Sequence, residues 1–273
     1  MVAFLAPVLV AVGCTVPAPR GTTAFVAPCA DVLLVGARGS GSGLRSDEVR
    51  AWDRALVADL PGRRVATVEL GDLDRDGVLD PGGYPAVPAD AAPGLDPTAD
   101  GTAGDLGVAG GFNDSRRIGT EELVRLLGAR QAVCPGERLV LAGYSMGATA
   151  VGVALRTLAA GVAGRVDAVV LFGDPTLVPG PWLRAPGAEF PSGHGLVGAR
   201  VPYVPDPFVD RTTSWCGLAD PYCTGNLAWF LVKLAPCAAL PQEPACSHRH
   251  EDYPRWAVPE AMQGAAAAVL ARH

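Results

Sequence analysis

The chain has 273 residues, of which 49% are hydrophobic and 18% charged, and its formal net charge is −6. This length suits one α/β domain with a sizeable buried core. The mildly acidic balance, without a cluster of basic residues, excludes a nucleic-acid partner that would need many phosphate contacts. No apolar run reaches the roughly eighteen residues that a membrane-spanning helix needs, so a transmembrane span is also excluded.

A leader segment is predicted at the N-terminus. Residues 1–13 form an apolar stretch that ends in small residues, and Cys14 and a proline-rich run follow. The pattern is typical of a secretory signal, although the usual positively charged start is missing. Residues 11–14 also weakly resemble a bacterial lipoprotein cleavage box. We assign 1–18 to the leader and 19–273 to a single domain, and we favour simple secretion over a lipid anchor on Cys14.

Buried strands and amphipathic helices then alternate along the chain. In chain order we predict a strand over 31–36, a helix over 46–60 capped by Ser46, a strand over 64–70, a helix over 114–131, a strand over 139–144, a helix over 146–160, a strand over 166–172 and a helix over 259–272. A long loop covers 71–111, the proline-dense 175–207 is expected to be surface loop, and 226–235 is helix-like. Such alternation predicts a three-layer α/β fold with a central, mostly parallel sheet.

The most informative motif is Gly143-Tyr144-Ser145-Met146-Gly147, which lies between a predicted strand and a predicted helix. Two glycines in this setting allow a sharp turn that exposes the serine hydroxyl, and the helix N-terminus supplies backbone N–H groups for an oxyanion. The pattern favours a nucleophilic Ser145. The alternative is an ordinary serine in a glycine-rich turn.

A nucleophilic serine needs a base to remove its proton and an acid to orient that base. In α/β hydrolases the acid and then the histidine follow the serine along the chain. The histidines after Ser145 are His194, His248, His250 and His273. His273 is the terminal residue and His194 precedes the best acid candidate, which leaves His248 and His250 just before the last helix.

Seven cysteines support an exported protein. If Cys14 leaves with the leader or carries lipid, six remain, which is consistent with three disulfides. Cys216 and Cys223 are near neighbours, as are Cys237 and Cys246, and Cys29 and Cys134 then remain for each other. Other pairings stay open at this point.

Several segments together resemble the cutinase family of serine esterases. They are Cys216-Gly-Leu-Ala-Asp220-Pro-Tyr-Cys223, His250-Glu-Asp-Tyr253, Val35-Gly-Ala-Arg-Gly-Ser40, Cys29 with Cys134-Pro135, and Tyr84-Pro-Ala86. Their order along the chain, from about Cys29 to the C-terminus, matches that of the family. The resemblance implies a cutinase-like α/β-hydrolase fold and carboxylic ester hydrolysis.

The resemblance also implies a role for individual residues. Ser145 is the nucleophile, His250 the base, and Asp220, in a small disulfide loop, the orienting acid. Ser40 and the backbone N–H of Met146 form the oxyanion hole. Met146 stands where cutinases usually have glutamine, and because the backbone N–H polarises the carbonyl, this change need not abolish activity.

Two features compete with or depart from this assignment. Asp174, which follows a predicted strand, is a rival for the orienting acid, but a disulfide-clamped turn favours Asp220. The separation of Asp220 and His250 exceeds that of compact cutinases. The intervening 224–249 segment, with Cys237 and Cys246, is either an apolar flap over the site or a helix packed on the core.

An acidic loop resembles the first part of a calcium-binding loop. Ligand positions 1, 3, 5 and 9 are occupied by Asp72, Asp74, Asp76 and Asp80, with Gly77 at position 6. Gly83 replaces the bidentate glutamate of position 12, so binding would need a remote carboxylate such as Asp90. We expect no cofactor, with calcium at this loop as the alternative to a solvated, aspartate-rich turn.

The predicted function is that of a secreted carboxylic ester hydrolase. It uses a Ser-His-Asp triad and an acyl-enzyme on lipid, polyester or cell-envelope acyl esters. An acyltransferase on the same scaffold is one alternative, and a non-catalytic envelope or binding protein with a hydrolase fold is another. We expect an extracellular or envelope-associated monomer whose partner is its ester or lipid substrate.

Overall fold

The computed structural model describes residues 28–87, 111–185, 193–225 and 250–272. Its strands are β1 Val32–Ala37, β2 Val65–Glu69, β3 Arg138–Tyr144, β4 Val166–Phe172, β5 Leu183–Arg184 and β6 Thr212–Trp215. Its α-helices are α1 Asp47–Asp59, α2 Gly111–Val133, α3 Met146–Ala154, α4 Ala160–Ala163, α5 Pro221–Thr224, α7 Tyr253–Trp256 and α8 Val258–Leu270. Two 3₁₀ helices, η2 Asp206–Arg211 and η4 His250–Asp252, complete the described elements.

These strands form one parallel sheet in the order β2-β1-β3-β4-β6-β5. The order reverses beside β1, which lies between β2 and β3. In open parallel sheets, ligands bind beyond the carboxyl ends of the strands at such a reversal. Ala37 is aligned with Gly143 across β1 and β3, so the loops that leave these two strands begin side by side. The topology therefore points to the segments after β1 and β3 as the place for a site.

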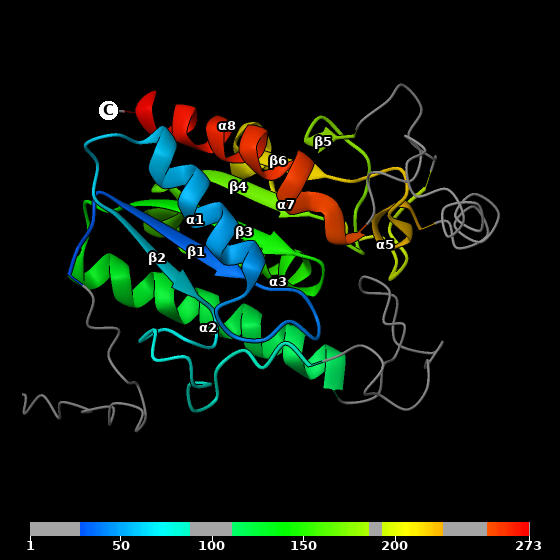
Figure 1. Ribbon diagram of the computed structural model, residues 1–273, viewed down its shortest axis with the longest axis horizontal. Helices are drawn as coiled ribbons and strands as arrows, with labels where there is room; N and C mark the ends of the chain where they lie inside the picture. Colours follow the sequence, from blue (N-terminus) through cyan, green and yellow to red (C-terminus); the bar gives the residue numbers. More distant parts are fainter. Residues whose placement is uncertain (1–27, 88–110, 186–192, 226–249, 273) are drawn as a thin grey trace, which may run out of the picture.

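Helices cover both faces of the sheet (Figure 1). α1 and α8 lie side by side on one face, where Trp52 of α1 stacks on Phe172 of β4 with ring centroids 5.6 Å apart. α2 and α3 lie on the other face, where Leu123 and Val151 join the larger of the two apolar clusters. The predicted three-layer α/β-hydrolase-like architecture is confirmed.

Most predicted elements are confirmed to within a few residues. The four predicted strands are β1 to β4, and the helices predicted over 46–60, 114–131 and 259–272 are α1, α2 and α8. Ser46 caps α1, and its hydroxyl accepts a hydrogen bond from the N–H of Val49 at 3.3 Å. These elements were predictable because each has its own apolar periodicity and end signals.

The prediction of one helix over 146–160 is wrong. α3 ends at Ala154, where the hydroxyl of Thr157 donates to the Ala154 carbonyl at 3.0 Å. Ala159 then has an extended backbone, from which the short α4 begins at Ala160. The alanine-rich composition favours helix throughout, but a local side-chain hydrogen bond competes with the helical pattern at its end.

The expectation of loop throughout 175–207 is also wrong, because β5 lies inside this segment. β5 pairs with β6, a strand that no prediction anticipated. β6 reads Thr-Thr-Ser-Trp and lacks an apolar run, yet it lies between β4 and β5 and is largely buried. The predicted leader at 1–18 and the helix-like 226–235 lie outside the described residues.

Both disulfides that fall within the described residues join the expected cysteines. Cys29 pairs with Cys134 across 105 residues, and Cys216 pairs with Cys223 across 7. The first links the segments before β1 and β3, and the second closes the turn between β6 and the end of α5. The predicted pair of Cys237 and Cys246 lies outside the described residues.

Candidate active site

The turn between β3 and α3 has the geometry of a nucleophile elbow. Ser145 has a φ of +53°, which is rare for a residue with a side chain and marks local backbone strain. Gly143 and Gly147 are required by close backbone approach. A Cβ at position 143 would lie 2.6 Å from the Ala148 Cα, and one at position 147 would collide with the carbonyl of Ala37. Two glycines thus let the turn pack tightly enough to hold this strained serine.

The elbow brings Ser145 to the surface of an otherwise buried segment. Residues 139–144 and 146–152 are buried, whereas Ser145 is partly exposed. Its backbone N–H donates to the carbonyl of Phe172 at the end of β4, at 2.8 Å. Its hydroxyl makes no hydrogen bond to any residue within the described ranges. The side chain is therefore free to meet a substrate.

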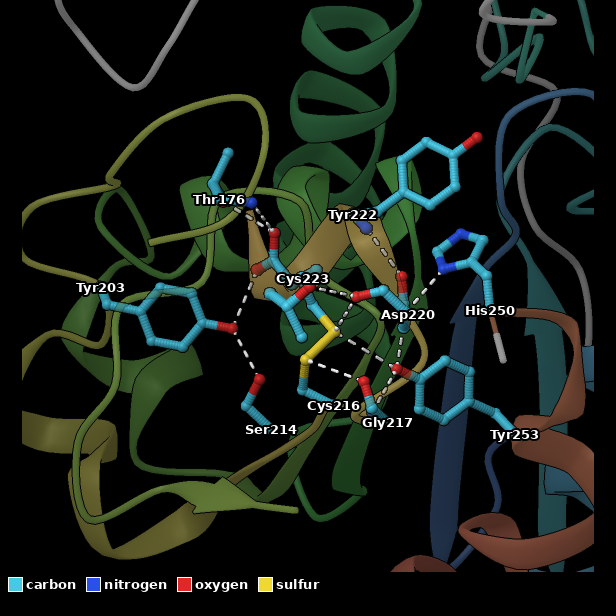
Figure 2. Close-up of a disulfide and its surroundings, with 12 residues drawn as sticks. Thr176, Tyr203, Ser214, Cys216, Gly217, Asp220, Tyr222, Cys223, His250 and Tyr253 are labelled. Carbon is cyan, nitrogen blue, oxygen red and sulfur yellow. Dashed lines mark hydrogen bonds and ion pairs between the residues drawn. A yellow bond between two sulfur atoms is a disulfide. The ribbon is translucent and has the colours of Figure 1, made fainter. Parts of the chain in front are cut away.

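Asp220 and His250 form a hydrogen-bonded pair close to the elbow (Figure 2). Asp220 follows β6 and caps α5, where its Oδ1 accepts from the N–H of Tyr222 at 2.9 Å. Nδ1 of His250 donates to Oδ2 of Asp220 at 2.8 Å. Asp220 is fully buried and His250 is 9% exposed. An orienting carboxylate thus holds one nitrogen of the imidazole, as a general base requires.

Contacts with neighbouring residues bring this pair to the same end of the sheet as Ser145. The imidazole of His250 packs against the ring of Tyr144, the residue before the nucleophile candidate, with centroids 4.8 Å apart. Gly173 directly follows β4, and a Cβ there would lie 2.8 Å from both Oδ2 of Asp220 and Cε1 of His250. Gly173, which sequence reasoning missed, therefore makes room for the pair beside the elbow.

The segment after β1 lies against the elbow and carries Ser40. A Cβ at Gly39 would lie 2.6 Å from the Tyr144 ring and 3.4 Å from the Ser145 Cβ. The hydroxyl of Ser40 donates to the carbonyl of Val87 at 2.6 Å. Met146 is the first residue of α3 and its side chain is fully buried. Ser40 and the Met146 N–H thus flank the nucleophile, as an oxyanion hole would.

A buried polar network holds the segment after β1 in place. Arg38 donates to the carbonyls of Leu70 at 2.5 Å and Tyr84 at 2.8 Å, and the Tyr84 hydroxyl donates back to the Arg38 carbonyl. Glu122 of α2 accepts from the N–H groups of Gly71 and Tyr84. Burial lowers the pKa of Arg38 and raises that of Glu122. Sequence reasoning missed Glu122, because a glutamate on a helix face usually signals solvent exposure.

Comparisons with known proteins agree with this geometry. The model of the Cutinase family matches residues 98–232. Carboxylesterase Culp1 of Mycobacterium tuberculosis is 27% identical over 217 residues, covering 77% of this chain and 77% of that protein, and Culp1 of Mycobacterium bovis matches equally. The family model and the mycobacterial relatives together support the cutinase family for this chain. The resemblance inferred from its motifs is confirmed.

Solved structures show the same fold as this chain. The catalytic core domain of acetyl xylan esterase from Trichoderma reesei has a TM-score of 0.61 at 21% identity, covering 88% of this chain and 99% of that one. A cutinase-like protein from Cryptococcus sp. has a TM-score of 0.55 at 20% identity, covering 89% and 98%. The fold is therefore a cutinase-like α/β-hydrolase fold. The predicted class of serine esterase is confirmed by the esterases to which the chain is similar.

Asp174, the rival acid, lies in a different hydrogen-bond network. It is fully buried, forms an ion pair with Arg200 at 2.9 Å and accepts from the Tyr203 hydroxyl at 3.0 Å. It also accepts from the hydroxyls of Thr149 in α3 and Thr176. Since no histidine of the described residues bonds to it, Asp174 braces the base of the elbow instead of orienting an imidazole.

The other histidines contribute nothing comparable among the described residues. Nδ1 of His194 lies 2.8 Å from the carbonyl of Gly195, its own neighbour. His248, which sequence reasoning left open beside His250, lies outside the described residues, as does His273. The 226–249 part of the segment considered as a flap is also outside them.

The acidic loop brings three carboxylates together. Asp72, Asp74 and Asp76 can each place one oxygen within 4.8 Å of the others. Asp72 is buried, its Oδ1 accepts from the N–H of Gly77 at 2.9 Å, and its Oδ2 lies 3.6 Å from Arg45. Asp90, the remote carboxylate considered for the shell, lies outside the described residues. Calcium binding at this loop stays a prediction.

Proposed function

We propose that this protein hydrolyses carboxylic esters with Ser145 as nucleophile, His250 as base and Asp220 as orienting acid. The observation that carries the proposal is the His250–Asp220 hydrogen bond at 2.8 Å, beside a strained serine elbow. Ser145 follows β3, Asp220 follows β6, and His250 is the first residue of η4, just before α7. Convergence of an alcohol, an imidazole and a carboxylate at one sheet edge is the arrangement that nucleophilic acyl transfer requires.

The reaction follows from this arrangement in two half-reactions. His250 removes the proton of the Ser145 hydroxyl while the oxygen attacks the ester carbonyl carbon. The tetrahedral intermediate collapses, the alcohol leaves with the proton from His250, and the acyl group stays on Ser145. In the second half-reaction His250 takes a proton from water, whose oxygen attacks the acyl carbon. Ser145 then leaves with that proton, and the carboxylic acid is released. Asp220 keeps Nδ1 occupied, so that Nε2 is the nitrogen that handles each proton.

The oxyanion of both tetrahedral intermediates needs hydrogen-bond donors. We propose the backbone N–H of Met146 and Ser40 for this role, because they flank Ser145 from α3 and from the segment after β1. The Ser40 hydroxyl, which donates to Val87, would turn toward the substrate oxygen when a charge develops there. Each such donor contributes about 10²–10³ to kcat in serine hydrolases.

The proposed substrates are esters of lipids, polyesters or acylated cell-envelope molecules. The mycobacterial relatives are named carboxylesterases and the fold neighbours include an acetyl xylan esterase, which supports an ester but spans very different acyl groups. Hydrolysis of p-nitrophenyl esters of increasing acyl length tests the chain length directly. Transfer of the acyl group to an added alcohol in preference to water would instead identify an acyltransferase.

We propose that the protein acts outside the cell as a monomer. Two disulfides support an oxidising location. Within the described ranges, no helix has both the length and the apolar character needed to cross a bilayer. The leader at 1–18 and the lipid anchor on Cys14 stay predictions, and mass spectrometry of the exported protein distinguishes a cleaved N-terminus from a lipidated cysteine.

Covalent labelling tests the proposed triad. We expect a fluorophosphonate to label the wild-type protein at Ser145 and to leave Ser145→Ala unlabelled. His250→Ala should lower the labelling rate by about 10⁴-fold or more, since the hydroxyl loses its base. His194→Ala is the matched control and should label at the wild-type rate. The ring of this exposed histidine bonds, among the described residues, only to its neighbour's carbonyl. A folded wild-type protein that does not label would refute the proposed function.

A further inference from the structure

One oxygen of Asp220 receives two side-chain donors. Oδ2 accepts from Nδ1 of His250 at 2.8 Å and from the hydroxyl of Tyr253 at 2.7 Å. Oδ1 accepts only the N–H of Tyr222 at 2.9 Å among the described residues. Figure 2 shows Tyr253 and His250 approaching Asp220 from the same side. The phenol and the imidazole therefore share the electron density of a single carboxylate oxygen.

The Tyr253 hydroxyl is fixed as a donor to that oxygen. It accepts from the N–H of Gly217 at 3.0 Å, so its own proton is directed to Asp220. Its ring is buried between aromatic neighbours, with the Trp256 centroid at 5.3 Å and the Phe172 centroid at 5.8 Å. Burial, with the charge of Asp220 adding to it, raises the pKa of Tyr253 well above its ordinary value. The phenol therefore stays protonated wherever the enzyme works.

We propose that Tyr253 is a positioning residue that acts through Asp220: by sharing Oδ2 with His250, it lowers the proton affinity of the imidazole and fixes the carboxylate for catalysis. This proposal rests on the proposed function of His250 as the base. The resemblance to cutinases included the His-x-x-Tyr spacing but assigned no task to its tyrosine. The chain Gly217 N–H to Tyr253 hydroxyl to Asp220 gives this residue a specific one.

The sign of the effect follows from electrostatics. A carboxylate oxygen that already accepts a strong hydrogen bond has less charge available for a second donor. Without the phenol hydroxyl, Asp220 would hold the imidazolium form of His250 more strongly. The base would then become neutral only at higher pH, and the acid limb of the kcat/KM profile would move upward.

Other titratable groups also face this pair, and they stay in place when only the hydroxyl is removed. They are Glu251 and Asp252 of η4, Tyr222 of α5, Tyr144 of β3 and, through Tyr144, Glu48 of α1. Because each is present in both proteins, a change between wild type and Tyr253→Phe reports the missing hydroxyl.

The test compares two tyrosines with the same local chemistry. Tyr203 is also buried and also donates to a buried aspartate, Asp174, at 3.0 Å. We expect Tyr253→Phe to move the acid limb of kcat/KM upward by about 0.5–1 pH unit. Tyr203→Phe should leave the limb at its wild-type position. Both variants lose a buried hydrogen bond, so both should melt at lower temperature, and only the pH profile separates their roles.

A second substitution covers the case in which Tyr253→Phe fails to fold. Replacing Tyr253 with 3-fluorotyrosine keeps the packing and makes the hydroxyl a stronger donor, so the acid limb should move downward. An acid limb that stays at its wild-type position in either variant overturns the proposal for Tyr253. If Ser145 still labels with a fluorophosphonate in that protein, the triad stands and only the Tyr253 proposal fails. If wild-type Ser145 does not label, the proposed function fails first.

Discussion

Two buried aspartates, Asp174 and Asp220, follow the neighbouring strands β4 and β6 and differ in the cationic group beside them. Both are fully buried, and each accepts a hydrogen bond from a buried tyrosine. Asp174 has Arg200 at 2.9 Å, whereas Asp220 has His250 at 2.8 Å. A buried aspartate bonded to a buried tyrosine therefore occurs twice at one sheet edge, once beside an arginine and once beside a histidine.

The difference indicates how one fold can separate a structural carboxylate from the one that we propose for catalysis. A guanidinium stays charged at any working pH, so Asp174 is neutralised permanently and its network is rigid. An imidazole gains its charge only when it takes a proton, so Asp220 is fully compensated only at that step. The stabilisation that Asp220 offers therefore grows as the transition state forms, which is the condition for catalysis.

The largest effect is expected from replacing Asp220, the proposed orienting acid. Asp220→Asn should lower kcat by about 10⁴-fold, because an amide can stabilise neither the correct tautomer of His250 nor its protonated form. Steady-state hydrolysis of a p-nitrophenyl ester measures this loss, and circular dichroism shows whether the fold is retained. A folded variant that keeps most of its kcat would identify a different orienting acid.

The complementary prediction concerns stability. Asp174→Asn should lower the free energy of unfolding by about 3–5 kcal/mol, because it leaves the guanidinium of Arg200 buried without its partner. Adding Arg200→Met should restore part of that loss, since no buried charge is then left without its partner. Thermal denaturation of the single and double variants measures both values. Fluorophosphonate labelling at low temperature should persist in each, and loss of labelling without loss of folding would make Asp174 a participant in the chemistry.

The sequence predicted the elbow far better than the distinction between these two aspartates. Ser145 was found because strand, glycine, serine, glycine and helix are contiguous, so the physics that exposes the hydroxyl is local. Asp174 and Asp220 each follow a strand, and the partners that separate them, Arg200 and His250, lie far along the chain. The disulfide-clamped turn and the family resemblance favoured Asp220, because no periodicity encodes which cation meets which carboxylate.

The fold was predictable for a similar reason, and its errors have a common cause. β1 and β4 are buried on both faces, and the apolar runs over 32–35 and 168–172 predict strands by themselves. β6 is held by pairing with β4 and β5, so its polar Thr-Thr-Ser stretch is a strand only in its tertiary setting. Glu122 was missed likewise, because a buried glutamate is recognisable only once its N–H partners are in place.

The two described disulfides differ in their distance along the chain from Asp220, so removing each one should have a different effect. Replacing Cys216 and Cys223 with serine should lower kcat by up to about 10²-fold, because the turn that presents Asp220 loses its clamp. Replacing Cys29 and Cys134 should cost more stability, about 4–5 kcal/mol for a loop of that length, with kcat less affected. Chemical denaturation and ester hydrolysis of both double variants separate the two effects. Equal losses of kcat would mean that the short bridge has no special role in the site.

The smallest effect is expected from Asp74, Asp76 and Asp80 of the acidic loop, which form no ion pair with any of the described residues, whereas Asp72 pairs with Arg45. Asp80 Oδ2 accepts from the N–H of Leu73 at 2.7 Å and Asp76 Oδ1 from that of Val78 at 2.6 Å, so the turn is stabilised by its own backbone. Even a calcium Kd near 1 mM would stabilise the fold by only about 0.4 kcal/mol at 1 mM calcium. We therefore expect the melting temperature to change by less than about 2 °C on calcium titration. A larger, saturable rise in the melting temperature that disappears in Asp74→Asn would instead establish calcium binding at this loop.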